Sequence, residues 1–289
     1  MSILHRLQVY ESRDDNATYG FLARDRAWGG YAICDLEPEP RQRSQFWAAR
    51  EGDQITALCL FYRVRDMCSL HTFGDPAGMA AILEQMPDRP AHAWVLARED
   101  HLEAIRSRYE MDSPERMWRM IATRETLSPT ASRARRMGMR DAPAVVDLYS
   151  ATRAAAVRPE TLLAQGCYGV WEDGRLVSIA GTHGLSRRRG IAAIGNVFTD
   201  PAYRDRGYAK MCVSALAADL VRVVPEIILN VGDSNTPALR VYDRVGFRRH
   251  CTYCEGRAEL LAEYASAQGA TAQHTPRRNP ARAVERRRR

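Results

Sequence analysis

The sequence predicts an α/β protein with two similar domains, each a mixed, mostly antiparallel sheet flanked by helices, the C-terminal one complete. The first observation is a strand-like run at residues 194–199, followed by a Gly-bearing turn and a helical pattern. The second is another apolar run at 227–231, followed by a helix-start signature at 233–237. The third is that a similar order of strands, turns and helices occurs earlier in the chain, from about residue 46.

The turn after residues 194–199 is a candidate phosphate site. Asp200 and Pro201 close the strand, and the helical pattern begins after Gly207. The first N–H groups of a helix have no intrahelical partner, and the helix dipole adds positive potential there. The turn therefore suits an anion. An ordinary helix N-terminus is the competing interpretation, because turns also need Gly for steric reasons.

A second strand and helix follow directly. Residues 233–237 combine capping residues with a Pro in the first turn, and the helix carries Tyr242 and stops at Gly246.

Together these segments resemble the GCN5-related N-acetyltransferase (GNAT) superfamily. The matching motifs are Arg204-x-x-Gly207-x-Ala209 and Asn235-x-x-Ala238-x-x-x-Tyr242-x-x-x-Gly246-Phe247, and the resemblance covers about residues 135–260. Within the superfamily the chain looks closest to the glycine N-acyltransferase-like branch, and a tandem arrangement with one active copy also resembles mycothiol synthase-like proteins.

The resemblance implies acetyl-CoA, or another acyl-CoA, as donor substrate. The positions that would bind it are Val197, Phe198 and Thr199 for the pantetheine arm, Arg204, Asp205, Arg206, Gly207, Tyr208 and Ala209 for the pyrophosphate, and Asn235.

The same resemblance assigns Tyr242 as the general acid that protonates the leaving thiolate, since a phenol is protonated at neutral pH. A tyrosine packed in the core is the alternative.

The identity of the general base is open, because Ala193 stands where many relatives have Glu. His183 is the first substitute, although a simple hairpin register turns it away from Ala193 unless a bulge intervenes. Asn196 could hold a water or bind the acceptor, and an amine that loses its proton to solvent needs no base.

The net charge and the cysteine content limit the classes of binding partner that we expect. Residues 265–289 contain seven Arg and one Glu, so they carry +6 of the net charge of +7. The rest of the chain is therefore close to neutral, which argues against nucleic acid as a binding partner. The seven Cys are scattered, as expected for reduced thiols, and predict no metal site. No apolar run is long enough to span a bilayer, so no membrane association and a cytoplasmic location are expected.

The repeated pattern divides the chain. We expect a degenerate GNAT-like domain at 1–125, a linker at 126–134, the catalytic domain at 135–264 and a disordered Arg-rich tail at 265–289. Between Asp75-Pro76 and Gly78 the first copy lacks the Arg-bearing loop of the second copy. Chance similarity of two common α/β units is the alternative. In the first copy, residues 31–34 are expected as a strand.

The sequence thus predicts transfer of an acetyl group to a small-molecule primary amine by direct attack in a ternary complex. A protein amine is an alternative acceptor, and a non-catalytic CoA-binding or nucleic-acid-associated regulator is the rival from another class. Ala193 in place of Glu favours that rival, whereas Asn235 with Tyr242 favours the enzyme. The acceptor's identity and the oligomeric state, including a homodimer, are left open.

Overall fold

The computed structural model describes residues 7–64, 67–128, 130–150 and 158–264, so the expected tail lies outside the described residues. The chain forms an α/β structure in which helices cover both faces of a mixed sheet. No helix in the described ranges is long and apolar enough to cross a membrane.

The N-terminal half follows a β-α-α-α-β-β-β-α-β-α order before its last two strands. Its strands and helices are β1 (Gln8–Ser12), α1 (Asp15–Leu22), α2 (Arg26–Cys34), α3 (Pro38–Arg41), β2 (Ser44–Glu51), β3 (Gln54–Val64), β4 (Met67–Gly74), α4 (Pro76–Gln85), β5 (His92–Ala97), α5 (Leu102–Arg106), β6 (Tyr109–Met111) and β7 (Glu115–Thr123).

The C-terminal half has a similar order, with one helix fewer before its three consecutive strands and one final strand instead of two. Its strands and helices are β8 (Arg135–Arg136), α6 (Ala142–Ser150), α7 (Pro159–Gln165), β9 (Cys167–Glu172), β10 (Arg175–Ser186), β11 (Ile191–Thr199), α8 (Tyr208–Leu220), β12 (Glu226–Gly232), α9 (Thr236–Val245) and β13 (Arg248–Leu260). The prediction of an α/β protein with two domains, the C-terminal one complete, is confirmed.

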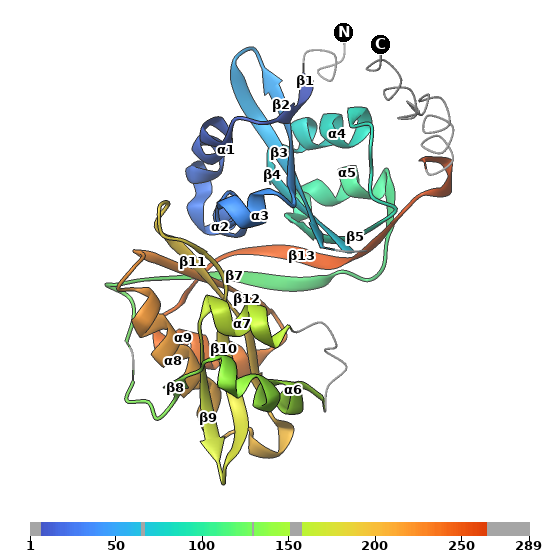
Figure 1. Ribbon diagram of the computed structural model, residues 1–289. Helices are drawn as coiled ribbons and strands as arrows, with labels where there is room; N and C mark the ends of the chain where they lie inside the picture. Colours follow the sequence, from blue (N-terminus) through green and yellow to red (C-terminus); the bar gives the residue numbers. More distant parts are fainter. Residues whose placement is uncertain (1–6, 65–66, 129, 151–157, 265–289) are drawn as a thin grey trace, which may run out of the picture.

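A long two-stranded ribbon joins the sheets of the two halves. The strand order among the described residues is β1-β2-β3-β4-β5-β13-β7-β12-β11-β10-β9-β8, with β6 also paired to β13. Figure 1 shows β13 and β7 running side by side across the middle of the molecule. The last strand of the chain therefore pairs with β5 of the N-terminal half, and β7 pairs with β12 of the C-terminal half.

The halves consequently exchange strands across the expected linker. Residues 126–134 separate the halves along the chain, but β7 precedes that segment and lies inside the C-terminal sheet. Pairing of strands remote in sequence depends on tertiary contacts, so local pattern cannot reveal it.

The exchange predicts that the C-terminal half will not fold alone. A fragment spanning residues 135–264 lacks β7, which pairs with β12 over its whole length and with β13 on its other side. We expect this fragment to show no cooperative thermal transition by circular dichroism, because β12 and β13 then have no strand between them. Co-expression with residues 1–126 should restore one transition. A fragment 135–264 that melts cooperatively and binds acetyl-CoA alone would contradict the strand exchange.

Helix α2 lies between the halves and packs on both. Its buried residues share a core cluster with Leu58 and Leu60 of β3 and with Ile191, Ala193 and Ile228 of the C-terminal sheet. A Cβ atom at Gly30 would lie 2.5 Å from Ile228 Cδ1, so glycine permits this close approach.

The prediction of a strand at residues 31–34 is therefore wrong. Asp25 caps the helix by accepting a hydrogen bond from Trp28 N at 3.0 Å. Ala32, Ile33 and Cys34 are all buried, because elements of both halves surround the helix. An apolar run without a polar face cannot be assigned to helix or strand by periodicity.

Candidate functional site

The central strands of the C-terminal sheet separate beside the predicted donor loop. β11 and β12 are parallel and pair only over Ile191–Ile194 and Glu226–Leu229. Beyond this point β11 bulges, with Asn196 in the left-handed region at a φ of 52°. The Tyr149 hydroxyl fixes the bulge by donating to Asn196 O at 2.9 Å. The edge of β11 that faces β12 is thus left without a strand partner over residues 197–199, where an extended arm could pair.

The loop after β11 has the geometry of an anion site. Asp200 begins a short 3-10 turn, and two left-handed residues follow, Asp205 at a φ of 62° and Gly207 at 80°. Gly207 is the N-cap of α8, and no side chain caps this helix. Residues 204–207 are exposed, and the space above Gly207 is open, because a Cβ added there would meet no atom within 4 Å. The first amides of α8 therefore face open space at the positive end of the helix dipole.

Two side chains of the predicted donor site make hydrogen bonds within the protein. Tyr208 is 7% exposed, and its hydroxyl donates to Glu172, so its ring points into the core. The side chain of Asn235 caps α9 by accepting from Ala238 N at 3.2 Å, although its amide N–H groups stay available. Val197, Phe198, Thr199 and Ala209 are half-buried.

Tyr242 lies on the inner face of α9. The residue is 6% exposed, and its ring packs edge-on against Phe247 with the ring centroids 6.1 Å apart. Its hydroxyl makes no hydrogen bond to any described residue and is not among the fully buried unpaired polar atoms. Burial raises the pKa of Tyr242 to about 12, so the phenol is protonated at neutral pH. The side chain can therefore donate a proton to a ligand.

The corresponding loop of the N-terminal half is closed. α4 begins at Pro76, directly after β4, and Asp75 caps it by accepting from Gly78 N at 2.7 Å. The Asp75 carboxylate thus caps the N-terminus of α4, whereas no side chain caps the N-terminus of α8 in the other half. The closed loop agrees with the expectation that the first copy lacks a donor site.

A cleft of about 520 Å³ lies between the two halves on the opposite side of the β11 bulge from α8. One wall comes from α2, α3, β3 and β4, and the other from α7, β10 and β11. Both His183 and Asn196 line it. The cleft therefore brings the N-terminal half to the strand that borders the candidate donor site.

His183 faces this cleft because the strand pairing is irregular. Thr182 pairs with Ile194 and Gly184 with Ala193, which leaves His183 in a bulge. Its ring lies 5.2 Å from that of Tyr31 on α2, the helix that also packs on Ala193. His183 and Ala193 thus lie on the same face. Burial, together with the charge of Arg119, lowers the pKa of His183, so its imidazole is neutral at pH 7.

Ala193 leaves no gap in the structure. Its side chain is fully buried against α2, and Cys34 of that helix donates to Ile191 O at 3.8 Å. A helix of the N-terminal half therefore covers the strand at Ala193.

A buried arginine underlies the cleft and was not predicted from the sequence. Arg119 of β7 is 1% exposed and makes no ion pair within the described chain. Its guanidinium donates to Ala27 O at 3.2 Å and lies over the rings of Trp28, Tyr31 and Tyr253 at 5.1, 4.5 and 5.7 Å. This charge lowers the pKa values of His71 and His183, after the effect of burial.

Three further cleft residues, Tyr31, Asp35 and His71, were also missed. They belong to the half without a donor motif, and no local pattern marks them as functional.

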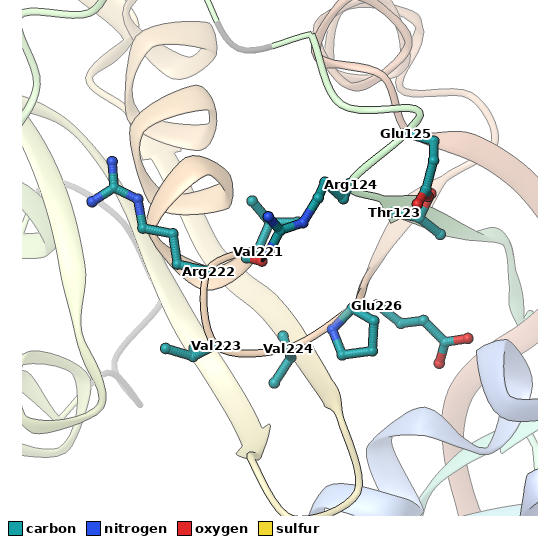
Figure 2. Close-up of a pocket in the computed structure, with 9 residues that line it drawn as sticks. Thr123, Arg124, Glu125, Val221, Arg222, Val223, Val224 and Glu226 are labelled. Carbon is teal, nitrogen blue, oxygen red and sulfur yellow. Dashed lines mark hydrogen bonds between the residues drawn. The ribbon is translucent and has the colours of Figure 1, made fainter.

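A second hollow, of about 380 Å³, lies at the other end of α8 (Figure 2). It is lined by residues 123–125 and 221–226, with Arg222 pointing away from it in the view. A helix of 13 residues is about 20 Å long, which is roughly the distance of this hollow from the donor loop. None of the predicted site residues lines it.

Comparisons with known proteins agree with this geometry. Residues 139–247 match the family model described as Acetyltransferase (GNAT) family. A [ribosomal protein bS18]-alanine N-acetyltransferase from Haemophilus ducreyi is 41% identical over 59 residues, which is 20% of this chain and 41% of that relative. The match therefore spans less than half the length of this curated relative.

Solved structures share the fold over most of the chain. A Drosophila protein has a TM-score of 0.64 at 14% identity, covering 89% of this chain and 99% of that one. A GCN5-related N-acetyltransferase from Sphaerobacter thermophilus has a TM-score of 0.55 at 18% identity, covering 88% and 96%. A tandem GNAT protein from the clavulanic acid biosynthesis pathway has a TM-score of 0.53 at 12% identity, covering 88% and 98%. At these identities the likeness concerns the fold alone.

Proposed function

Because the family match over residues 139–247 and the fold support membership of the GNAT superfamily, we propose that this protein transfers an acetyl group from acetyl-CoA to a small-molecule primary amine. The observation that carries the proposal is the uncapped start of α8 at Gly207, beside the unpaired edge of β11.

The residues present fit such a donor. The amides that begin α8 and the exposed guanidinium groups of Arg204 and Arg206 would bind the pyrophosphate. The backbone of residues 197–199 would pair with the pantetheine arm as an added strand. When bound, acetyl-CoA supplies an acyl group on a thioester sulfur.

Side chains around the β11 bulge would donate the proton to the leaving sulfur and receive the amine. The Tyr242 hydroxyl, protonated at neutral pH and free of other partners in the described chain, would give its proton to the leaving sulfur. The cleft that holds His183 and Asn196 would receive the amine, so that attack occurs directly within a ternary complex.

The N-terminal half would be a degenerate second copy that shapes the acceptor cleft. Its order of elements is similar to that of the C-terminal half, while Asp75 closes its donor loop. Within the superfamily, the resemblance to glycine N-acyltransferase-like proteins favours a small acceptor, for which the cleft between the halves offers a site.

A screen of primary amines with acetyl-CoA, following release of the free thiol, tests the function. We expect amine-dependent thiol release and a product heavier by one acetyl group. A peptide with an N-terminal alanine tests a protein amine as the acceptor, because the bS18-modifying relative is named as an alanine N-acetyltransferase. Failure to bind acetyl-CoA in calorimetry would overturn the proposal, and binding without transfer to any amine would favour the regulatory alternative.

Removing residues 265–289 tests the nucleic-acid alternative. This segment carries +6 of the net charge of +7, and none of its residues belongs to the proposed site. We expect acetyl transfer and melting temperature to be nearly unchanged. Loss of salt-dependent RNA or DNA binding on truncation would instead support that alternative.

A further inference from the structure

We propose that Asp35, on the cleft wall formed by the N-terminal half, binds the ammonium group of the acceptor and takes its proton before the nitrogen attacks. This inference rests on the proposed function, because it assigns a role within the same acceptor cleft.

The position of Asp35 follows from the packing of α2. Asp35 directly follows Cys34, and a Cβ at Gly184 would lie 3.0 Å from Cys34 Cβ. Gly184 pairs with Ala193 across β10 and β11. The end of α2 therefore carries a carboxylate to the neighbourhood of the strand position that has lost one.

Asp35 differs from the other acids of the cleft because its carboxylate has no partner among the described residues. Glu37 accepts a hydrogen bond from the Ser186 hydroxyl at 2.6 Å and pairs with Arg189 at 3.4 Å. Glu39 pairs with Arg43. Burial alone raises the pKa of Asp35 to about 7. A half-buried, unpaired carboxylate is unfavourable for folding, and a base whose pKa lies near the working pH is well suited to proton transfer.

His71 gives an independent indication that the cleft receives a ligand. It is 7% exposed and lines the cleft, yet its ring makes no hydrogen bond to another described residue. Burial, with smaller effects of Arg119 and His183, lowers the pKa of His71 to about 3. Both imidazoles of the cleft are therefore neutral at pH 7. They can form hydrogen bonds with an amine, and His71 is a much weaker base than Asp35.

The other titratable groups that face the cleft do not neutralise Asp35. Burial raises the pKa values of Tyr31, Tyr62 and Cys34, so all three are neutral at pH 7. Arg158 is a cation on the opposite wall, but it is exposed and pairs with no described carboxylate. Asp35 is thus the acid of the cleft that has no cationic partner among the described residues, and a primary ammonium is the complementary group.

The acceptor nitrogen loses two protons in the reaction. The ammonium gives the first to Asp35, and the neutral nitrogen forms the C–N bond with the acetyl carbon as the C–S bond breaks. Tyr242 gives its proton to the departing sulfur. The second proton of the nitrogen then reprotonates the Tyr242 phenolate. The products are the amide, the free thiol and one proton that Asp35 releases to solvent.

The first measurement requires no acceptor. An unfolded aspartate loses its proton near pH 4 and Asp35 near pH 7, so between these values the native state binds more protons and stability falls as pH rises. Asp35→Asn removes this effect. We expect the variant to melt above the wild type at pH 8, with a smaller gap at pH 5. The matched control Glu39→Gln, which removes a paired acid of the same wall, should show no such gain.

The second measurement uses 2-phenylethylamine as the acceptor probe. For Asp35→Asn we expect kcat to fall about 100-fold or more, with acetyl-CoA affinity unchanged. The wild-type kcat/KM should rise with pH through an apparent pKa near 7, and this limb should be absent from the variant. Asp35→Glu should restore part of the rate.

Two results would overturn the inference while leaving the proposed function intact. One is an Asp35→Asn enzyme that acetylates the amine at the wild-type rate with the same pH profile. The other is a variant less stable than the wild type at pH 8, which would make the carboxylate structural. A wild-type protein that binds no acetyl-CoA would instead overturn the proposed function, and with it the catalytic role of Asp35.

Discussion

Gly207→Glu should reduce the affinity for acetyl-CoA about 100-fold or more, which corresponds to ~3 kcal/mol. Gly207 has a φ of 80° and caps α8 without a side chain, and the space above it is open. A carboxylate there would lie among the amides proposed to bind the pyrophosphate, as Asp75 does at α4. Isothermal calorimetry with acetyl-CoA measures the effect.

Gly207→Ala is the matched control for backbone strain. Any L-residue at this φ costs about 1–2 kcal/mol, so both variants should melt somewhat below the wild type. Because alanine adds neither charge nor a long side chain, its loss of acetyl-CoA affinity should stay below about tenfold. Unchanged calorimetric binding in Gly207→Glu would show that the donor binds elsewhere.

Tyr242→Phe should lower kcat by about 100-fold while acetyl-CoA affinity stays nearly constant. The hydroxyl has no hydrogen-bond partner in the described chain, and the ring contact with Phe247 is kept in the variant. The fold should therefore be little affected. General acid catalysis is worth about 10² to 10⁴ in rate, and a thiol, as a good leaving group, favours the low end. A loss of turnover with constant donor binding indicates an interaction made in the transition state.

The pH dependence gives a second test of Tyr242. Since burial raises its pKa to about 12, the phenol stays protonated at pH 9, and the wild type should show no alkaline loss of rate from Tyr242 at that pH. Full activity of Tyr242→Phe on a verified acceptor would rule out the acid role. Loss of binding and stability together would make the tyrosine structural.

Strong local signals explain why the turns and the starts of α8 and α9 could be predicted. The turn at Gly207 and the cap at Asn235 lie between short, well-bounded apolar runs, and each depends on residues only a few positions apart. The structure has both helices starting where the motifs predict. In contrast, the donor-site roles of these residues and the acid role of Tyr242 stay predictions, because they concern a ligand.

The face of the sheet on which His183 lies could not be predicted from local sequence pattern. A regular hairpin would turn its side chain away from Ala193, and only the bulge between Thr182 and Gly184 brings both to one face. A bulge adds one residue to one strand, and its position depends on what packs on the sheet, here the ring of Tyr31 from another part of the chain.

The sequence by itself determined the α/β class, the presence of two domains and the loop beside α8, because each is encoded in short-range periodicity and turn chemistry. Only the tertiary structure decided the strand exchange, the placement of α2 over Ala193 and the presence of Asp35 in the acceptor cleft. These features depend on contacts between distant segments, such as the ion pair of Arg26 with Glu226 at 2.7 Å and the hydrogen bond between Asp25 and His250 at 2.7 Å. Such contacts form when two separately encoded surfaces bury apolar area against each other, and neither surface alone indicates its partner.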